Sequence, residues 1–375
     1  MPKNKGKLVC MVVVFVLALT LSVGCFTRSN AEADDQPAPP PGMPSLKEIY
    51  KDYFEIGAAV NLSTINTHRS LIDLHFSSLT AENEMKPEGL QRTEGRFSFQ
   101  IADRIVNLAV DQGLKMRGHT LVWHAQTPGW FFQDKNGNRI DQKAVITEED
   151  RQLVRERLES HIENVMQYYA GKVYAWDVVN EAISDDGRYI LRQDSPWFRI
   201  LGEEFLEIAF RKAHEVDPDA KLFYNDYNIE RPYKLNRTIQ MLQSLLDKGV
   251  PIHGVGIQGH WSVGDSLAEV EQAIKKYAEL GLEIHITELD IGTRDISAQG
   301  LARQAEYYRQ AFALFKKYSD VITSVTLWGI SDAATWRPND NPLLFDKNRE
   351  PKPAFWAIVD TDKSWEENKA YYLGE

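Results

Sequence analysis

Residues 148–181 of the chain read EEDRQLVRERLESHIENVMQYYAGKVYAWDVVNE. In the first part of this stretch, apolar residues from Leu153 to Met166 fall near helical spacing, with Arg, Glu and Gln between them. This pattern predicts an amphipathic helix over 148–168. The last part, 172–181, is an apolar and β-branched run, which predicts a buried strand that ends at Glu181. A helix followed directly by such a strand is the repeating unit of an α/β fold.

The same alternation recurs along most of the chain. Strands are predicted over 54–60, 77–83, 115–124, 172–181, 221–228, 254–260, 283–290 and 324–330. Helices are predicted over 99–111, 148–168, 198–215, 233–248, 267–280 and 299–317, and Gly113, Gly249 and Gly281 stand where helices give way to strands. Eight strand–helix alternations predict a parallel sheet closed into a (β/α)8 TIM barrel. An open doubly wound sheet is the rival fold, but it favours a Gly-rich turn after the first strand, and Val60-Asn61-Leu62-Ser63 is no such turn.

The N-terminal segment differs from the rest. Three lysines within the first seven residues precede an apolar run from Leu8 to Gly24, and Ala31-Glu32-Ala33 fits a signal-peptidase site. These features predict a signal peptide over 1–33 that is removed, an exposed Pro-rich leader over 34–45, and one catalytic domain over 46–375. A membrane anchor is the alternative, but the run is short for a bilayer span. A lipid anchor on Cys25 is a further alternative, and otherwise we expect a secreted protein.

Charge and cysteine content limit the partners of the mature chain. Both cysteines, Cys10 and Cys25, precede Ala33, so a large core rather than cross-links is expected to stabilise the domain. The whole chain carries a formal charge of −11, and removal of a segment with a net +3 leaves about −14. Such an acidic surface argues against nucleic acid or an anionic membrane as partner of the mature chain, whereas a neutral polymer is unaffected.

Polar and aromatic side chains stand where the predicted strands end. In a barrel, active sites lie at the carboxyl ends of the strands. Those ends carry Glu82-Asn83, His119 to His124, Asn180-Glu181, Asn225 to Asn228, Gln258-Gly259-His260, Glu288-Leu289-Asp290 and Trp328. Any one of these residues could be a capping or surface group, but a set on successive strands predicts a polar, aromatic-lined cleft.

Two of the carboxylates suit the hydrolysis of a glycoside. This reaction needs one carboxylic acid to protonate the leaving oxygen and one carboxylate on the opposite sugar face. Glu181 and Glu288 are the best pair, because each ends an apolar strand. Burial should raise the pKa of the acid, while a nearby donor keeps the other group ionised. A retaining mechanism predicts a carboxyl separation of roughly 5–5.5 Å, and inversion predicts a larger one.

Other chemistries fit the sequence less well. It has neither a phosphate loop nor a Gly-x-Ser-x-Gly elbow. His119 and His124 are five positions apart, so a regular strand would direct them to opposite faces, and we expect no shared metal. The run 134–138 is read as a turn, because Val145 occupies the position where a calcium loop needs Glu. We expect neither a metal nor a cofactor.

Five segments resemble family 10 of the glycoside hydrolases, the barrel xylanases. They are Glu82-Asn83-Glu84-Met85-Lys86, Gly118-His119-Thr120-Leu121-Val122-Trp123-His124, Trp176-Asp177-Val178-Val179-Asn180-Glu181, Gly256-Ile257-Gln258-Gly259-His260 and Ile286-Thr287-Glu288-Leu289-Asp290. The resemblance runs from about Leu46 to about Asp360. It implies a secreted endo-acting enzyme that cleaves β-1,4-xylosidic bonds of xylan with retention and releases xylo-oligosaccharides, and we expect it to be a monomer.

The resemblance also implies a role for each site residue. Glu181 would be the acid/base and Glu288 the nucleophile, with His260 and Asp290 orienting Glu288 and Asn180 binding the sugar 2-hydroxyl. The remaining residues would bind substrate, namely Glu82, Asn83, Lys86, His119, Trp123, Gln126, Tyr227, Asn228, Gln258, Trp328 and Trp336. Alternatives are a simple Glu82–Lys86 ion pair and a place for Trp336 in the core.

Two other functions remain open from the sequence. A cellulase or mannanase can carry carboxylates on the same two strands. A xylanase differs from them because xylose lacks the C6 hydroxymethyl group, whose position Trp328 and Gln126 could crowd. The other alternative is a catalytically silent glycan-binding protein, although the presence of both carboxylates disfavours it.

Overall fold

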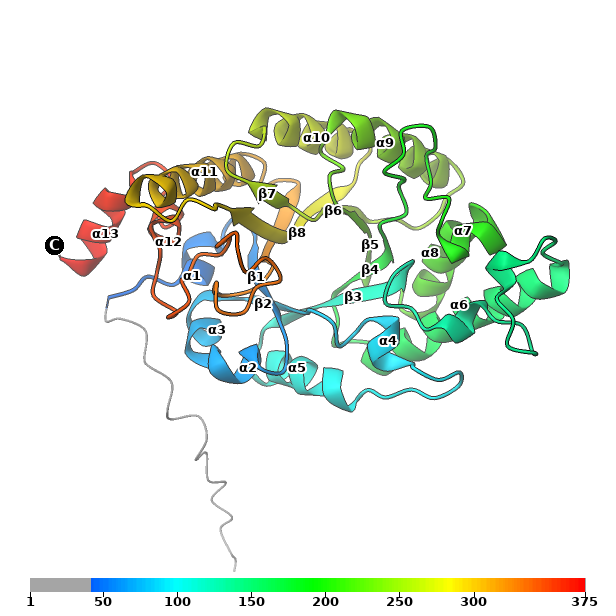
Figure 1. Cartoon of the computed structure of the whole chain (residues 1–375). Coiled ribbons are helices and arrows are strands. Elements are labelled where there is room, and N and C mark those ends of the chain that lie inside the picture. The colour runs from blue at the N-terminus through cyan, green and yellow to red at the C-terminus, as the bar shows by residue number, and fades with distance from the viewer. Residues whose placement is uncertain (1–41, 375) are drawn as a thin grey trace, which may run out of the picture. The chain divides into compact units, whose positions relative to one another are not determined.

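The computed structural model of the protein describes residues 42–374, and a ring of parallel strands stands at its centre (Figure 1). The ring closes in the order β1, β2, β3, β4, β5, β6, β8 and β9, because β6 pairs with β8 and β9 pairs with β1. The bounds are β1 Glu55–Val60, β2 Ser78–Ala81, β3 Lys115–Trp123, β4 Ala175–Asn180, β5 Lys221–Asp226, β6 Gly254–Ile257, β8 Glu283–Gly292 and β9 Ile322–Leu327. The predicted (β/α)8 barrel is confirmed, since an open sheet would leave two unpaired edges.

The predicted sixth strand, 254–260, is interrupted. It ends at Ile257 as β6, and the chain pairs again with β8 as the short strand β7, His260–Ser262. Gly259 between them has φ 81°, a left-handed conformation that glycine adopts without steric cost. The interruption brings His260 into register with Asp290.

Helices surround the ring of strands (Figure 1). Their bounds are α1 Leu46–Tyr50, α2 Thr64–Thr67, α3 Arg69–His75, α4 Pro87–Leu90, α5 Gln100–Asp111, α6 Glu148–Tyr169, α7 Pro196–Leu201, α8 Glu204–Val216, α9 Pro232–Asp247, α10 Leu267–Glu279, α11 Ala298–Lys317, α12 Pro353–Ala357 and α13 Trp365–Leu373, with 3-10 turns η1 Gly129–Phe132 and η2 Ile140–Gln142. The prediction of one helix over 198–215 is wrong. Gly202 has φ 63°, which ends α7, and α8 begins two residues later.

Local sequence explains why the longest helix begins where it does. Thr147 precedes α6, and its hydroxyl accepts a hydrogen bond from the backbone N–H of Asp150 at 3.2 Å. The carboxylate of Asp150 accepts in return from the backbone N–H of Thr147 at 3.1 Å. This reciprocal pair satisfies two N–H groups that the helix itself cannot satisfy.

The start of the domain lies earlier than the sequence predicted. Met43 is 8% exposed and belongs to the core, and the Ser45 hydroxyl donates to the backbone carbonyl of Leu74 at 2.5 Å. The last residues of the predicted exposed leader, 34–45, are therefore packed onto the domain. The predicted signal peptide, 1–33, and the rest of the leader up to residue 41 lie outside the described residues. Across residues 42–374, no helix combines the length and apolar character that a bilayer span requires.

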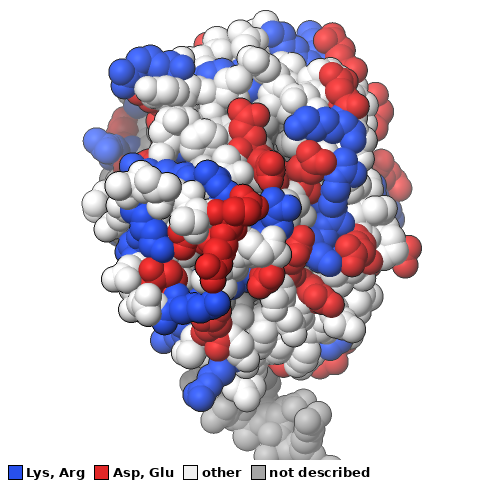
Figure 2. All heavy atoms as spheres, turned by 90° about the vertical axis from the view of Figure 1, so that its right-hand side faces the viewer, with Lys and Arg blue, Asp and Glu red and all other residues white. Residues whose placement is uncertain are grey.

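Charged side chains of both signs are interspersed on the face shown in Figure 2 rather than gathered into a single-sign patch. Ion pairs also join neighbouring surface elements: Arg155 on α6 pairs with Glu204 on α8 at 2.8 Å. Exposed pairs of this kind contribute little to stability individually, so the fold rests mainly on its apolar core.

Close contact between β3 and β4 leaves no room for a side chain at Gly118. The neighbouring Trp176 is fully buried, and a Cβ atom added at Gly118 would lie 2.2 Å from its ring. The next residue on β3 is His119, whose side chain faces the cleft described below. The absence of a side chain at Gly118 therefore lets β3 lie close to β4 next to that cleft.

We expect Gly118→Ala to lower the free energy of unfolding by about 1–3 kcal/mol, because the extra methyl group overpacks the barrel against a large buried ring. Urea denaturation followed by circular dichroism measures this loss. Gly129→Ala is the matched control, since an added Cβ there meets nothing within 4 Å. Equal midpoints for both variants would contradict the overpacking argument.

Candidate active site

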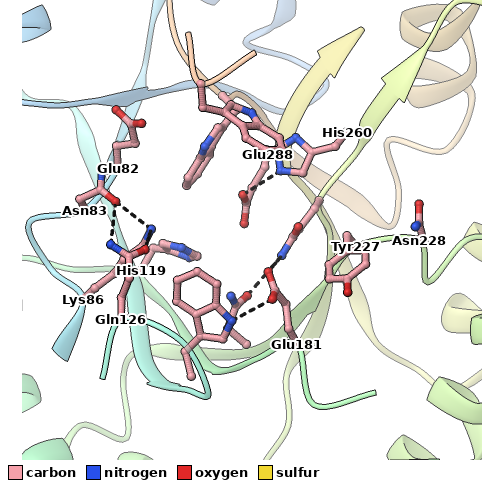
Figure 3. Close-up of a pocket in the computed structure, with 15 residues that line it drawn as sticks. Glu82, Asn83, Lys86, His119, Gln126, Glu181, Tyr227, Asn228, His260 and Glu288 are labelled. Atoms are coloured by element: carbon pink, nitrogen blue, oxygen red, sulfur yellow. Dashed lines mark hydrogen bonds and ion pairs between the residues drawn. The ribbon is translucent and has the colours of Figure 1, made fainter. Parts of the chain in front are cut away.

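A cleft of about 490 Å³ opens at the carboxyl ends of the strands (Figure 3). The side chains that line it are Glu82, Asn83, Lys86, His119, Trp123, Gln126, Asn180, Glu181, Tyr227, Asn228, Gln258, His260, Glu288, Trp328 and Trp336. Every site residue predicted from the sequence lies among them except Asp290, which is buried behind the cleft wall. Strands far apart in the chain thus bring one set of polar and aromatic groups together, as the barrel rule requires.

Glu181 follows the last residue of β4 in a left-handed conformation, with φ 58°. Its carboxylate accepts hydrogen bonds from the indole N–H of Trp123 at 2.8 Å and from Nε2 of Gln258 at 3.0 Å. Burial raises the pKa of Glu181, and the negative charges of Asp226 and Glu288 raise it further, while the two hydrogen bonds partly offset this effect. Glu181 is thereby favoured in its protonated form.

Glu288 lies in the opposite electrostatic environment. Its Oε2 is 3.2 Å from Nε2 of His260, and its Oε1 accepts from Nδ2 of Asn225 at 2.9 Å. Burial on its own would raise the pKa of Glu288, but the bond to His260 and the positive charge near the carboxylate outweigh it, so the pKa lies below its usual value. The buried Glu288 is thereby kept ionised.

Amide side chains connect the two carboxylates. Nε2 of Gln258, bound to Glu181, lies 3.4 Å from the amide of Asn180. That amide lies 2.8 Å from Nδ2 of Asn225, which reaches Glu288. Glu181 and Glu288 therefore share one cleft and one polar network, with one favoured as an acid and the other as a carboxylate.

Asp290 acts from behind the cleft through His260. Its Oδ2 is 3.1 Å from Nδ1 of His260 and accepts from the indole N–H of Trp336 at 2.8 Å. Burial disfavours a charged imidazole, but the carboxylate of Asp290 outweighs burial and, with Glu288, raises the pKa of His260 to about 10. Trp336 is 56% exposed, so the alternative that it belongs to the core is wrong.

A second group of side chains forms one end of the cleft. The ammonium of Lys86 donates to Oδ1 of Asn83 at 3.0 Å and to Oε1 of Gln126 at 2.8 Å, and lies 4.9 Å from the ring centre of Trp123. Glu82 accepts instead from Nδ2 of Asn61 at 2.9 Å, so these contacts do not favour a simple Glu82–Lys86 pair. Burial lowers the pKa of Lys86.

Two carboxylates outside the cleft bind side chains that line it. The hydroxyl of Tyr227 donates to Oδ2 of Asp185 at 2.5 Å. His119 lies 2.8 Å from the fully buried carboxylate of Asp177 and packs edge-on against Trp328, with ring centres 5.3 Å apart. Residues 42–374 contain no cluster of His, Cys, Asp and Glu suited to a metal ion.

Comparison with known proteins identifies the family. The profile of Glycosyl hydrolase family 10 matches residues 45–361. The chain belongs to this family. The resemblance inferred from the five sequence segments is therefore confirmed.

Several named xylanases align with most of this chain and with nearly all of their own length. A β-1,4-xylanase of Dictyoglomus thermophilum is 45% identical over 367 residues, covering 93% of this chain and 97% of the relative. The crystal structure of an endo-1,4-β-xylanase from Caldicellulosiruptor owensensis has a TM-score of 0.80 at 46% identity, covering 85% of this chain and 100% of that one. An intracellular xylanase of Thermoanaerobacterium saccharolyticum, solved as a mutant with xylotetraose, has a TM-score of 0.79 at 44% identity, covering 84% and 98%.

The family 10 cleft also contains contacts of residues whose roles were not predicted from the sequence. Asn225 contacts Glu288, Asp177 contacts His119, and Nη1 of Arg337 donates to Oδ1 of Asp290 at 2.6 Å. Asn225 and Asp177 stand in the strand motifs, so a place for them near the cleft was predictable. Arg337 lies in the loop after β9, where no periodic pattern marks it.

We expect His260→Asn to raise the pKa of Glu288 in this family 10 enzyme. The variant removes the hydrogen bond and the positive charge that otherwise oppose the effect of burial on this carboxylate. Protonation of Glu288 would begin at higher pH, and the acidic limb of activity would move upward with it. The δ-carbon shift of isotope-labelled Glu288 measures the midpoint directly. His253→Asn, outside the cleft, is the control, and an unmoved midpoint in His260→Asn would refute the assignment.

Proposed function

We propose that this family 10 hydrolase is an endo-β-1,4-xylanase that cleaves xylan within the chain and retains the anomeric configuration. The observation that carries the proposal is the pair of opposed carboxyl groups in one cleft, with the pKa of Glu181 raised and that of Glu288 lowered. Relatives named as xylanases, 44–46% identical over most of the chain, support the choice of substrate.

The proposed reaction has two displacements. Glu181 gives its proton to the glycosidic oxygen while Oε1 or Oε2 of Glu288 attacks the anomeric carbon, so a covalent glycosyl-enzyme forms and the leaving sugar departs neutral. Glu181, now a carboxylate, takes a proton from water, whose oxygen attacks the same carbon and releases Glu288. Each step inverts the centre, so the product retains the original configuration, and the mechanism predicts carboxyl groups roughly 5–5.5 Å apart.

The other cleft residues suit substrate binding in this proposal. Asn180 lies between the two carboxylates, where it can bind the 2-hydroxyl of the sugar at the cleavage point. Figure 3 shows Glu82, Asn83 and Lys86 to one side of Glu181 and Glu288, with Tyr227 and Asn228 to the other. A cleft that extends past the carboxylates in both directions fits internal cleavage of a polymer.

We expect the purified chain to release reducing ends from xylan much faster than from carboxymethylcellulose, because in this proposal the cleft residues Trp328 and Gln126 crowd the position of a C6 hydroxymethyl group. Proton NMR of the first products is expected to show the β-anomer before mutarotation. Comparable rates on the two polymers would favour a cellulase-type specificity, and first products in the α-form would overturn retention.

Variants of the two carboxylates separate the enzyme from a silent glycan-binding protein. Glu181→Ala and Glu288→Ala are each expected to lower kcat on xylan by at least about 10²–10⁴-fold, the usual contribution of such groups. Both should unfold at temperatures close to the parent chain. Wild-type protein that binds xylan but never cleaves it would support the silent reading.

We further propose that the enzyme is a secreted monomer whose residues 1–33 are removed. The basic start, the apolar run and the small-residue motif support the signal peptide. Family membership does not decide the location, since one relative is described as intracellular.

Expression of the full chain in a bacterial host should place activity in the culture medium or periplasm. The intact mass of the active protein should match a chain that begins at Asp34. A measured mass that matches the full chain from residue 1 would refute cleavage. A lipid-modified N-terminus at Cys25 would show a lipid-anchored form instead. Light scattering of the same sample tests the monomer, because a dimer doubles the measured mass.

A further inference from the structure

Strand β5 holds the backbone on both sides of Glu181. The N–H of Glu181 donates to the carbonyl of Asn225 at 2.8 Å. The next two N–H groups, of Ala182 and Ile183, each donate to the hydroxyl of Tyr224 at 3.0 Å. Three consecutive peptide groups are thus held by one strand, at the point where Glu181 has φ 58°. A left-handed glutamate persists only where its surroundings enforce that conformation.

The hydroxyl of Tyr224 is itself fixed by Asp226. It donates to Oδ2 of Asp226 at 2.5 Å, and the N–H of Ile183 reaches the same oxygen at 3.3 Å. The other oxygen, Oδ1, accepts from Nζ of Lys234 at 2.9 Å and from the N–H of Tyr227 at 2.8 Å. The side chains of Tyr224, Asp226 and Lys234 are all fully buried.

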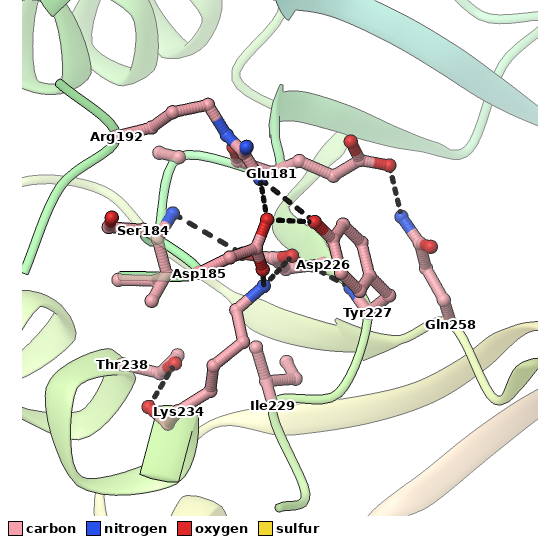
Figure 4. A network of polar contacts seen from close by, with 12 residues as sticks. Glu181, Ser184, Asp185, Arg192, Asp226, Tyr227, Ile229, Lys234, Thr238 and Gln258 are labelled. Atoms are coloured by element: carbon pink, nitrogen blue, oxygen red, sulfur yellow. Dashed lines mark hydrogen bonds and ion pairs between the residues drawn. The ribbon is translucent and has the colours of Figure 1, made fainter. Parts of the chain in front are cut away.

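Asp185 and Arg192 lie next to this buried group and connect it to Glu181 and Tyr227 (Figure 4). Nζ of Lys234 is 3.4 Å from Oδ1 of Asp185, whose Oδ2 accepts from Arg192 at 3.1 Å. Nε of Arg192 donates to the carbonyl of Glu181 at 3.2 Å, and its Nη2 donates to the hydroxyl of Tyr227 at 3.0 Å. The backbone of Glu181 is therefore held by its N–H from β5 and by its carbonyl from Arg192.

We propose that Tyr224 and Asp226 are positioning residues that aim the carboxyl group of Glu181 at the leaving oxygen of the substrate. The inference rests on the proposed function, in which Glu181 is the acid/base. Neither side chain lines the cleft. Both contact the peptide groups that follow Glu181, and Asp226 also accepts from the backbone N–H of Tyr227. Misplacing a catalytic acid slows the steps that need its proton far more than those that do not.

Charge adds a second effect of Asp226 on the same group. The charged groups that face Glu181 are Asp226 on β5, Glu288 on β8, Lys86 before α4 and Arg192 after β4. Burial is the largest cause of the raised pKa of Glu181, and the carboxylate of Asp226 is the next. Loss of that negative charge should lower the pKa of Glu181.

The test compares substrates that differ only in their leaving group. A 2,4-dinitrophenyl β-xylobioside loses a stable anion and needs no proton, whereas phenyl β-xylobioside needs the acid. We expect Tyr224→Phe and Asp226→Asn to lower kcat/KM on the phenyl glycoside by about 10–100-fold, and on the dinitrophenyl glycoside by less than about threefold. In Asp226→Asn the basic limb of kcat/KM should also move to lower pH, because Glu181 would ionise more easily.

Matched variants separate positioning from general loss of structure. Asp332→Asn breaks another buried aspartate–lysine pair, whose oxygen lies 2.9 Å from Nζ of Lys352. Tyr50→Phe removes another buried hydroxyl, which donates to the carbonyl of Ile358. These controls should leave the ratio between the two substrates and the position of the basic limb unchanged, whatever their effect on stability.

Equal losses on both glycosides for Tyr224→Phe and Asp226→Asn, or no loss on either, would overturn the proposal. If Asp226→Asn does not fold, Tyr224→Phe alone decides it, since that variant keeps the Asp226–Lys234 pair. Failure of the proposed function is recognised separately, because the unaltered chain would then hydrolyse neither xylan nor the two glycosides.

Discussion

A buried carboxylate stays ionised only when hydrogen-bond donors and positive charge replace the water that it has lost. Glu288, 5% exposed, meets this condition through His260 on one oxygen and Asn225 on the other. His260 carries its charge because Asp290 faces its second ring nitrogen, and Arg337 binds Asp290 in turn. Alternating charges thus run from the cleft into the loop after β9, and together they favour the ionised form of Glu288.

Glu181, the other glutamate of the cleft, lies in the reverse electrostatic environment. The carboxyl group of Glu181 accepts hydrogen bonds from two neutral groups, the indole of Trp123 and the amide of Gln258, and it faces the negative charge of Asp226. The pKa values of two glutamates at one rim are therefore shifted in opposite directions, because different strands surround them with different partners. The closed parallel barrel makes this possible, since β4, β5 and β8 all end at the same edge.

Residues at strand ends were predictable because each follows an apolar run, and their convergence follows from barrel topology alone. Contacts that loops and helices make with the strands were not predictable in this way. The position of Arg337 depends on the path of a loop, and the buried pair of Asp226 and Lys234 joins a strand to a helix without any periodic signal. The split at Gly202 and the interruption at Gly259 likewise depend on backbone angles that composition does not encode.

The half-exposed ring of Trp336 has a consequence for the energetics of sugar binding. A free surface indole samples several rotamers, and immobilising such a side chain costs on the order of 0.5–1.5 kcal/mol when a ligand arrives. The hydrogen bond from the indole N–H of Trp336 to Asp290 restricts this freedom in advance. In the proposed role of Trp336, a sugar ring that stacks on this indole meets a side chain whose rotamers are already restricted, so more of the contact energy remains as affinity.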